Sequence, residues 1–410
     1  MNADDLQLRT LTSSDFDQLI ELDEMVFHDE PSSAEIRAMS AELQDLDGGR
    51  GTGVFDGDEL VGVGTINGFE MAVPGGLLPL AGVLLIGVKP THTRRGVMSR
   101  VIRHQLHTLH EQGLEPLAGL TASESVIYGR FGYGVATYSG NLTVPRHRAG
   151  LRPVQGAADV RIRMVPTAGT VELCEAIHAR QVGTRAGMLV RPQSWARLYA
   201  ADPEQWRDGR SVLRTVLAER DGRAIGFARY RTRSDEKAGY TWVQQMHADD
   251  VAGYAALAGY LLNLDLTAGT KFSRQPLDSP LVYLLSDFRS AEMRVADELY
   301  LRLVDVDRAL AGRTYSAPVN VVLEVGDGLC PWNAGRWRLT GDEKGATCTR
   351  TEDAADVALD VRELASAYLG GATLLALAGA GQVSELRPGA VTDASRAFAT
   401  DLAPWLQFGI

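Results

Sequence analysis

Hydrophobic and polar residues alternate along the first third of the chain in a pattern that predicts strands and helices in turn. Residues 6–11 alternate as a strand does, and residues 16–27 carry apolar side chains at helical spacing behind Ser13, Ser14 and Asp15, which are typical of a helix start. A hairpin around Asp56-Gly57, a strand at 83–88, a helix at 97–112 and a strand at 117–121 follow. This order predicts a mixed α/β domain.

The opening pattern then recurs. Residues 160–166 and the helical stretch to Gln181 repeat the first strand and helix, and the hairpin at Asp221-Gly222 repeats the one at Asp56-Gly57. A second α/β domain is therefore expected. The Pro- and Arg-rich stretch 144–153 is the expected link between the two copies.

The pattern changes again from about Leu299. Residues 321–325, 335–340 and 357–361 predict antiparallel strands, and residues 364–380 and 390–400 predict two helices. A third domain, of the α+β class, is the expected result. The last residues, 404–410, are mostly apolar, so we expect this terminus to dock on the protein.

Composition narrows the classes of function. The 410 residues include 41 Lys and Arg against 52 Asp and Glu, a net charge of −11, which argues against nucleic acid or a membrane surface as partner and suits a small cationic substrate. The three cysteines show no paired spacing, which argues against a disulfide framework or zinc site and for a reducing compartment. The acidic N-terminus and the lack of a long apolar run predict a cytoplasmic protein.

The turn Arg94-Arg95-Gly96 lies between an apolar strand and a helix start. A helix N-terminus offers unpaired N–H groups, glycine permits close approach and arginines add charge, so this turn is a candidate phosphate site. An ordinary turn with solvated arginines explains the same residues about equally well.

Two motifs carry a family resemblance. Val88 to Gly96 and Ile127 to Tyr133 resemble the acetyl-CoA signature of the GCN5-related N-acetyltransferases, and Ala122 to Gly134 is very similar to the motif of the Eis (enhanced intracellular survival) family. The resemblance covers essentially the whole chain. It implies tandem α/β acetyltransferase domains, at 1–147 (catalytic) and 148–297 (degenerate), and a sterol-carrier-protein-like α+β domain at 298–410 whose C-terminus reaches the active site.

The resemblance also implies acetyl-CoA as cosubstrate and the residues that hold it. The acetyl end would lie against Ile86, Gly87 and Val88. The pyrophosphate would lie against Arg94, Arg95, Gly96, Val97, Met98 and Ser99. The rest of the cofactor would lie against Ser123 and Glu124. Thr93 and Met98 depart from the superfamily pattern, which prefers Gln or Arg and a small residue there. The backbone donors of the turn are unaffected by either departure.

Two residues resemble the catalytic pair of the family. Tyr128 corresponds to the general acid, and the terminal carboxylate of Ile410 corresponds to the base. The alternatives are that Tyr128 only packs and that the apolar tail docks only for stability. Gly409 stands where an acidic penultimate residue is expected, which leaves preference for aminoglycosides open.

Acidic residues around the first helix suit a cationic acceptor. Asp29 and Phe27 are the expected substrate-binding residues, with Asp23, Glu24 and Glu30 as further candidates to line an electronegative cleft or as plain surface charges. No metal site is expected, because His104, His107 and His110 do not share one helix face. In the second copy, residues 242–250 bring acids where the first has Arg-Gly, so that copy is expected to be inactive.

The predicted function is an acetyl-CoA-dependent N-acetyltransferase whose acceptor is a primary amine of an aminoglycoside-like molecule, a polyamine or a lysine. The amine would attack the thioester directly, with the Val88 N–H polarising the acetyl carbonyl, because no paired Cys or Ser nucleophile is evident. The resemblance implies a homo-oligomer, a hexamer. The alternatives are a carrier of lipid or other hydrophobic ligands that uses an apolar tunnel beside residues 364–380, and a protein-lysine acetyltransferase with little small-molecule activity.

Overall fold

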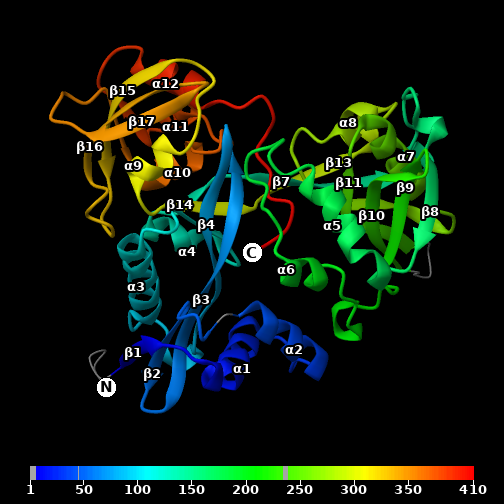
Figure 1. The fold of residues 1–410 in the computed structure, drawn as a ribbon, viewed down its shortest axis with the longest axis horizontal. Coiled ribbons are helices and arrows are strands. Elements are labelled where there is room, and N and C mark those ends of the chain that lie inside the picture. The colour runs from blue at the N-terminus through cyan, green and yellow to red at the C-terminus, as the bar shows by residue number, and fades with distance from the viewer. Residues whose placement is uncertain (1–5, 45, 234–238) are drawn as a thin grey trace. The chain divides into compact units, whose positions relative to one another are not determined.

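The computed structural model describes residues 6–44, 46–233 and 239–410, which fold into two compact units (Figure 1). The first unit contains the described residues up to Thr137, together with 298–401 and 409–410; the second contains residues 138–297 and 402–408. The domain boundaries expected after residues 147 and 297 stay a prediction, because this division groups residues by contacts and keeps the N-terminal and C-terminal parts together.

The first unit contains a seven-stranded sheet. Its order is β1 (Gln7–Thr10), β2 (Gly51–Asp56), β3 (Glu59–Val73), β4 (Gly76–Val88), β5 (Leu117–Thr121), β14 (Leu299–Leu303) and β6 (Gly134–Val135). β3 and β4 form a long hairpin (Figure 1). The strand predicted at 83–88 is therefore only the second half of β4, since Gly82 and Pro79 weaken the alternating pattern without breaking the ladder.

Helices cover both faces of this sheet. α1 (Phe16–Phe27) packs its buried Leu19 and Ile20 on one face, and α3 (Val97–Gln112) packs Val97 and Val101 on the other. Gly62 on β3 permits the close approach of α3, because a Cβ there would lie 2.3 Å from Val97 Cγ1. The remaining helices of this part are α2 (Ala34–Leu43) and α4 (Ser125–Tyr128).

β4 and β5 separate after a short parallel pairing. Only residues 80–82 of β4 pair with residues 117–119 of β5. Beyond Gly82, β4 stays paired with β3 through a bulge in which Leu85 adopts a φ of +51°. The ends of β4 and β5 therefore diverge and leave an opening in the middle of the sheet.

The second unit repeats this plan. Its sheet has the order β13 (Glu292–Asp297), β7 (Tyr138–Pro145), β12 (Thr267–Gln275), β11 (Gly239–Ala248), β10 (Arg223–Arg233), β9 (Arg214–Arg220) and β8 (Arg161–Val165). Its helices are α5 (Val171–Ala179), α6 (Gln193–Leu198), α7 (Val251–Leu262) and α8 (Pro280–Leu284). From β8 to β12 the strands and helices follow the order of β1 to β5, which agrees with the repeat found in the sequence.

The chain exchanges strands between the two sheets. β7 directly follows β6 of the first sheet but pairs with β12 and β13 of the second. β14 directly follows β13 but pairs with β5 and β6 of the first sheet. The first residues of the link predicted at 144–153, Val144 and Pro145, belong to β7, and the link itself stays a prediction.

The C-terminal part of the first unit has its own five-stranded sheet. The strand order is β17 (Gly345–Arg350), β16 (Gly335–Asp342), β15 (Val319–Gly326), β18 (Val357–Asp360) and β19 (Val383–Glu385). Its helices are α9 (Val306–Ala311), α10 (Val361–Ala367), α11 (Leu374–Gly379) and α12 (Ala390–Phe398).

Two expectations for this part were wrong. β15 and β18 are parallel, not antiparallel, because a connection through β16 and β17 separates them in the chain. The single helix expected at 364–380 is two helices, since the chain turns at Gly370, whose φ is +83°.

A buried ion pair joins this part to the first sheet. Arg302 of β14 donates from Nη2 to Asp327 Oδ2, which lies after β15, at 2.6 Å, and both side chains are at most 1% exposed. Asp327 also accepts from the backbone N–H groups of Leu329 and Cys330 and from the side chain of Asn333. The carboxylate is therefore fully engaged at the point where two sheets meet.

We expect Asp327→Asn to lower the free energy of unfolding by about 3–5 kcal/mol, because it leaves the Arg302 charge buried without its partner. Chemical denaturation followed by circular dichroism measures the change. Asp353→Asn is the matched control, since it breaks the exposed pair with Arg338 and should cause no measurable change. Equal stability of the two variants would contradict this role of Asp327.

Candidate active site

The start of α3 is open to an anion. Gly96 precedes the helix with a φ of +79°, Arg94 has a φ of +61°, and no side chain caps the helix N-terminus. Arg95 Nη2 is buried and has no hydrogen-bond partner among the described residues. Free helix N–H groups and an unpaired guanidinium nitrogen together fit a phosphate group.

The side chains of Val97 and Met98, which follow Gly96, make contacts within the protein. Val97 is buried in the core, so only its backbone is available to a ligand. Met98 is half-buried, and its sulfur accepts a weak contact from Arg130 Nη2 at 3.6 Å. Of the residues predicted for the pyrophosphate, Val97 therefore offers only its backbone, whereas Arg94 is exposed and Arg95 has the unpaired Nη2 among the described residues.

The divergent end of β4 directs one backbone donor into the opening. Lys89 N–H bonds to Val61 O at 2.9 Å, so the N–H of Val88, the preceding residue, points away from β3. Ile86 is buried in the core below α3, and the Cα of Gly87 faces Val26 of α1. Val88 is thus a predicted cofactor residue on this strand whose N–H does not point to β3.

The C-terminus lies on the β5 side of the same opening. Thr121 N–H donates to one oxygen of the Ile410 carboxylate at 3.0 Å, and the Thr121 hydroxyl donates to the same oxygen. Because the Thr121 N–H bonds to Ile410 and not to Leu299, the residue opposite it in β14, it points to the side of β5 from which β4 has departed. Sequence reasoning missed Thr121, since nothing local links it to a residue 289 positions away.

Tyr128 ends α4 and is 6% exposed. Its ring packs against Tyr133 and Tyr300 at centroid distances of 6.0 and 6.4 Å. Burial, and then the charge of Glu124, raise the pKa of Tyr128 above its ordinary value of 10.0. The phenol therefore keeps its proton at neutral pH and can donate it. Ser123 and Glu124 are exposed just before α4.

The acidic residues in and just after α1 differ in their surroundings. Asp29 is exposed beyond the end of the helix, next to Phe27, which is 40% exposed. Glu24 is occupied, because it accepts from Ser32 N–H at 2.8 Å. Asp23 is half-buried, its Oδ1 has no partner among the described residues, and burial together with Asp29 and Glu24 raises its pKa to about 6. Asp23 is therefore the unusual carboxylate of this helix.

Ser99 lines a pocket beside α3. A pocket of about 550 Å³ is lined by Ser99 and Arg103 of α3, by Arg130 and by Arg362. Asp327 and Asp360 also line it, but the first is paired with Arg302 and the second caps α10. The sequence analysis did not single out Arg103 or Arg130.

Two histidines of α3, His107 and His110, pack against Trp332. His110 Nδ1 lies 2.5 Å from Asp305 Oδ1 and the ring stacks on Trp332, which His107 meets edge-on. In the described part of the chain, no three His, Cys, Asp or Glu side chains form a group that could hold a metal ion. In the same ranges, no helix is long and apolar enough to cross a membrane.

The second copy differs at the corresponding helix start. Asp250 caps α7 and accepts from Gly253 N–H at 2.8 Å, and Arg220 pairs with the same carboxylate. A carboxylate thus stands where a phosphate would bind.

Comparison with known proteins agrees with this geometry. Residues 7–136 and 187–303 match two family models described as acetyltransferase (GNAT) domains, and residues 306–407 match one described as a sterol carrier protein domain. A protein of Streptomyces avermitilis described as an uncharacterized N-acetyltransferase is 47% identical over 92% of this chain and 93% of its own. The N-acetyltransferase Eis of Mycobacterium bovis is 35% identical over 85% of this chain and 86% of its own.

The chain belongs to the Eis family of N-acetyltransferases. The crystal structure of Eis1 from Mycobacterium abscessus matches with a TM-score of 0.84 at 34% identity, over 99% of this chain and 100% of that one. A GCN5-related N-acetyltransferase from Anabaena variabilis has the same fold at 19% identity, with a TM-score of 0.86 over 99% of this chain and 100% of that one. The predicted family, fold class and enzyme class, an acetyltransferase, are confirmed.

We expect Asp23→Asn to stabilise the protein at pH 7.5 by about 1–2 kcal/mol and to have little effect at pH 4. Because the folded-state pKa of about 6 lies above the unfolded value of 3.8, the wild type loses stability as the pH rises between these values and the variant does not. Thermal unfolding across this pH range measures the difference. Asp17→Asn, at an 84% exposed side chain of the same helix, is the control. Parallel pH profiles for wild type and Asp23→Asn would refute this account.

Proposed function

We propose that this Eis-family enzyme transfers the acetyl group of acetyl-CoA to a primary amine of a cationic acceptor in the opening between β4 and β5. The observation that carries the proposal is the terminal carboxylate, which Thr121 fixes on one side of the opening while the Val88 N–H faces it from the other strand. A fixed proton acceptor and a fixed oxyanion donor on opposite strands are the two groups that amine acetylation needs.

The residues present fit acetyl-CoA as cosubstrate. The uncapped start of α3 with Arg95 suits the pyrophosphate, and Ser123 and Glu124 stand on the path toward Tyr128. The adjoining pocket with Arg103 and Arg130 suits the remaining, phosphorylated end of the nucleotide. When bound, acetyl-CoA supplies an activated acetyl thioester.

Each of the three catalytic groups has one task. The Val88 N–H stabilises negative charge on the acetyl oxygen, and the Ile410 carboxylate takes a proton from the attacking amine, directly or through water. Tyr128, which its raised pKa keeps protonated at neutral pH, gives its hydroxyl proton to the leaving sulfur. Ile410 is only 8% exposed, so its carboxylate is largely shielded from bulk water.

The acidic end of α1 suits a positively charged acceptor. Asp29 and the unpaired Asp23 provide negative charge beside Phe27, and a bound ammonium group would stabilise the ionised form of Asp23. Aminoglycoside-like molecules, polyamines and lysine side chains all carry such groups. Gly409 leaves the penultimate position without a charge, which favours smaller acceptors with fewer ammonium groups. The homo-oligomer, a hexamer, stays part of the proposal.

Replacing the general acid and moving the base test the mechanism together. We expect Tyr128→Phe to lower kcat at least about 100-fold, since the leaving sulfur loses its proton donor. Two glycines added after Ile410 should have a similar effect because they displace the carboxylate. The measurement is thiol release from acetyl-CoA with spermidine, lysine and an aminoglycoside, with acetyl-CoA affinity determined in parallel.

Full activity of the extended chain would refute the role of the terminal carboxylate. Acetylation of a protein acceptor alone would favour a protein-lysine acetyltransferase. Failure of the wild type to bind acetyl-CoA would favour the carrier of hydrophobic ligands.

Thr121 offers a finer test. We expect Thr121→Val to lower kcat about 10- to 100-fold, because one of the two hydrogen bonds that position the Ile410 carboxylate is lost while the side-chain shape is kept. Thr121→Ser retains the hydroxyl and should keep most of the activity. The pH profile of kcat should shift in the valine variant, since the carboxylate loses a donor that favours its charged form. Equal activity of the two variants would contradict a positioning role for Thr121.

A further inference from the structure

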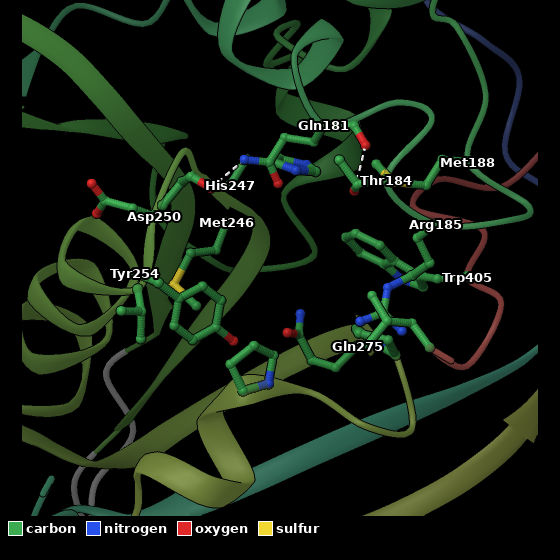
Figure 2. Close-up of a pocket in the computed structure, with 15 residues that line it drawn as sticks. Gln181, Thr184, Arg185, Met188, Met246, His247, Asp250, Tyr254, Gln275 and Trp405 are labelled. Atoms are coloured by element: carbon green, nitrogen blue, oxygen red, sulfur yellow. Dashed lines mark hydrogen bonds between the residues drawn. The ribbon is translucent and has the colours of Figure 1, made fainter. Parts of the chain in front are cut away.

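The second copy keeps a pocket at the place where the first copy has its opening. β11 pairs in parallel with β12 only from Gly239 to Val243, after which the strands separate. A pocket of about 230 Å³ lies beyond this point, between the end of β11, the start of α7 and the segment after β12 (Figure 2). The geometry of the repeat is thus preserved although its chemistry has changed.

This pocket is not a second acetyl-CoA site. At the start of α7 the Asp250 carboxylate accepts from Gly253 N–H and pairs with Arg220, whereas the start of α3 has no capping side chain. A phosphate approaching α7 would meet a negative charge and occupied donors. The occupant therefore has different chemistry from the cofactor of the first copy.

The walls of the pocket are aromatic and sulfur-containing. Figure 2 shows Trp405 on one side of the cavity and Met246 and Tyr254 on the other. Met188 and Leu402 add further apolar surface. Aromatic rings and thioethers pack favourably against the flat face or edge of another ring.

Among the described residues that line the pocket, each charged side chain already has a partner of opposite charge. Arg185 pairs with Asp278 and donates to Ala403 O at 2.6 Å, and Asp250 is held by Arg220. His247, 3% exposed, is neutral, because burial and the charges of Arg191 and Arg229 lower its pKa to about 3. Its Nδ1 has no hydrogen-bond partner among the described residues.

We propose that this pocket binds a small, uncharged, planar aromatic molecule that carries one hydrogen-bonding N–H or O–H group. The volume of about 230 Å³ suits a ligand of one or two fused rings. Such a ring lies between Trp405 and the methionine and tyrosine side chains, and its polar group satisfies the buried imidazole.

The pocket is also connected to the catalytic terminus through the chain. Leu402 and Trp405 belong to the tail that ends at Ile410, and within the second unit this tail is tied down by Trp405 N–H to Ala186 O at 2.8 Å and by Trp405 Nε1 to Arg274 O at 2.6 Å. A ligand packed on Trp405 restrains this tail further and so changes kcat. This second consequence, unlike the site itself, rests on the proposed function of Ile410.

Three probes with one ring and different charges test the proposal: indole, tryptamine and indole-3-acetate. The full-length protein, with its six tryptophans replaced by 5-fluorotryptophan, is titrated and followed by 19F NMR, and Trp405→Phe assigns the Trp405 signal. Uncharged indole is expected to shift this signal saturably with a Kd of about 1 mM or below, several-fold tighter than either charged probe.

Two matched variants separate this pocket from other sites. Val251→Phe narrows the pocket at a 54% exposed residue and is expected to weaken indole binding at least about 5-fold, because the added ring occupies part of the cavity. Val295→Phe makes the same change at an equally exposed residue of β13 outside the pocket lining and should leave binding unchanged.

No saturable shift with indole, equal effects of the two variants, or tighter binding of a charged probe would overturn the site. The catalytic consequence is checked by acetyl-transfer rates with saturating indole, which should change kcat of the wild type and not of Val251→Phe. Binding with no change in kcat would overturn the link to Ile410 and support the site alone. Loss of acetyl transfer in Tyr128→Phe is independent of every one of these outcomes.

Discussion

The separation of β4 from β5 is the feature on which the proposed site depends. Parallel pairing stops after Gly82 and Gly119, so the backbone groups beyond these residues lack their usual partners. The bulge at Leu85 keeps β4 on β3 while turning it from β5. Ile410 supplies one of these partners, because its terminal oxygen accepts a hydrogen bond from the Thr121 N–H. The Val88 N–H points away from β3 and is the donor that the proposed mechanism assigns to the acetyl oxygen.

The rest of the first unit keeps this opening rigid. β14 closes the other side of β5, and its Arg302 is bound to Asp327 of the C-terminal part. Gly62 brings α3 close to β3, and α1 covers the opposite face. Tyr128 packs on Tyr300 of β14, so the strand that arrives from far along the chain also supports the expected acid. The exchange of strands between the two sheets therefore supports the proposed site as well as the fold.

Local signals in the sequence predicted what depends on neighbours in the chain. The hairpin at Asp56-Gly57, the start of α3 after Gly96 and its end at Gly113 follow from residues within a few positions. The pairing of β14 with β5 and the bond from Thr121 to Ile410 could not be predicted this way, because alternation identifies a strand without naming its partner. The break at Gly370 was missed because apolar residues continue on both sides. The motif around Tyr128 supplied the family, which spacing alone would not have given.

The two copies show how one change at a helix start alters what a fold can bind. In both, a parallel pair of strands separates next to a helix N-terminus. Gly96 leaves the donors of α3 free, whereas Asp250 uses those of α7 internally and gains a stabilising cap. A capped helix has its first N–H groups satisfied within the chain, so the adjacent cavity does not need an anion to satisfy them. Trp405 and Leu402 of the tail line that cavity, and the same tail continues to Ile410. In the second copy the capped helix start and the anchoring of the C-terminal segment thus adjoin the same cavity.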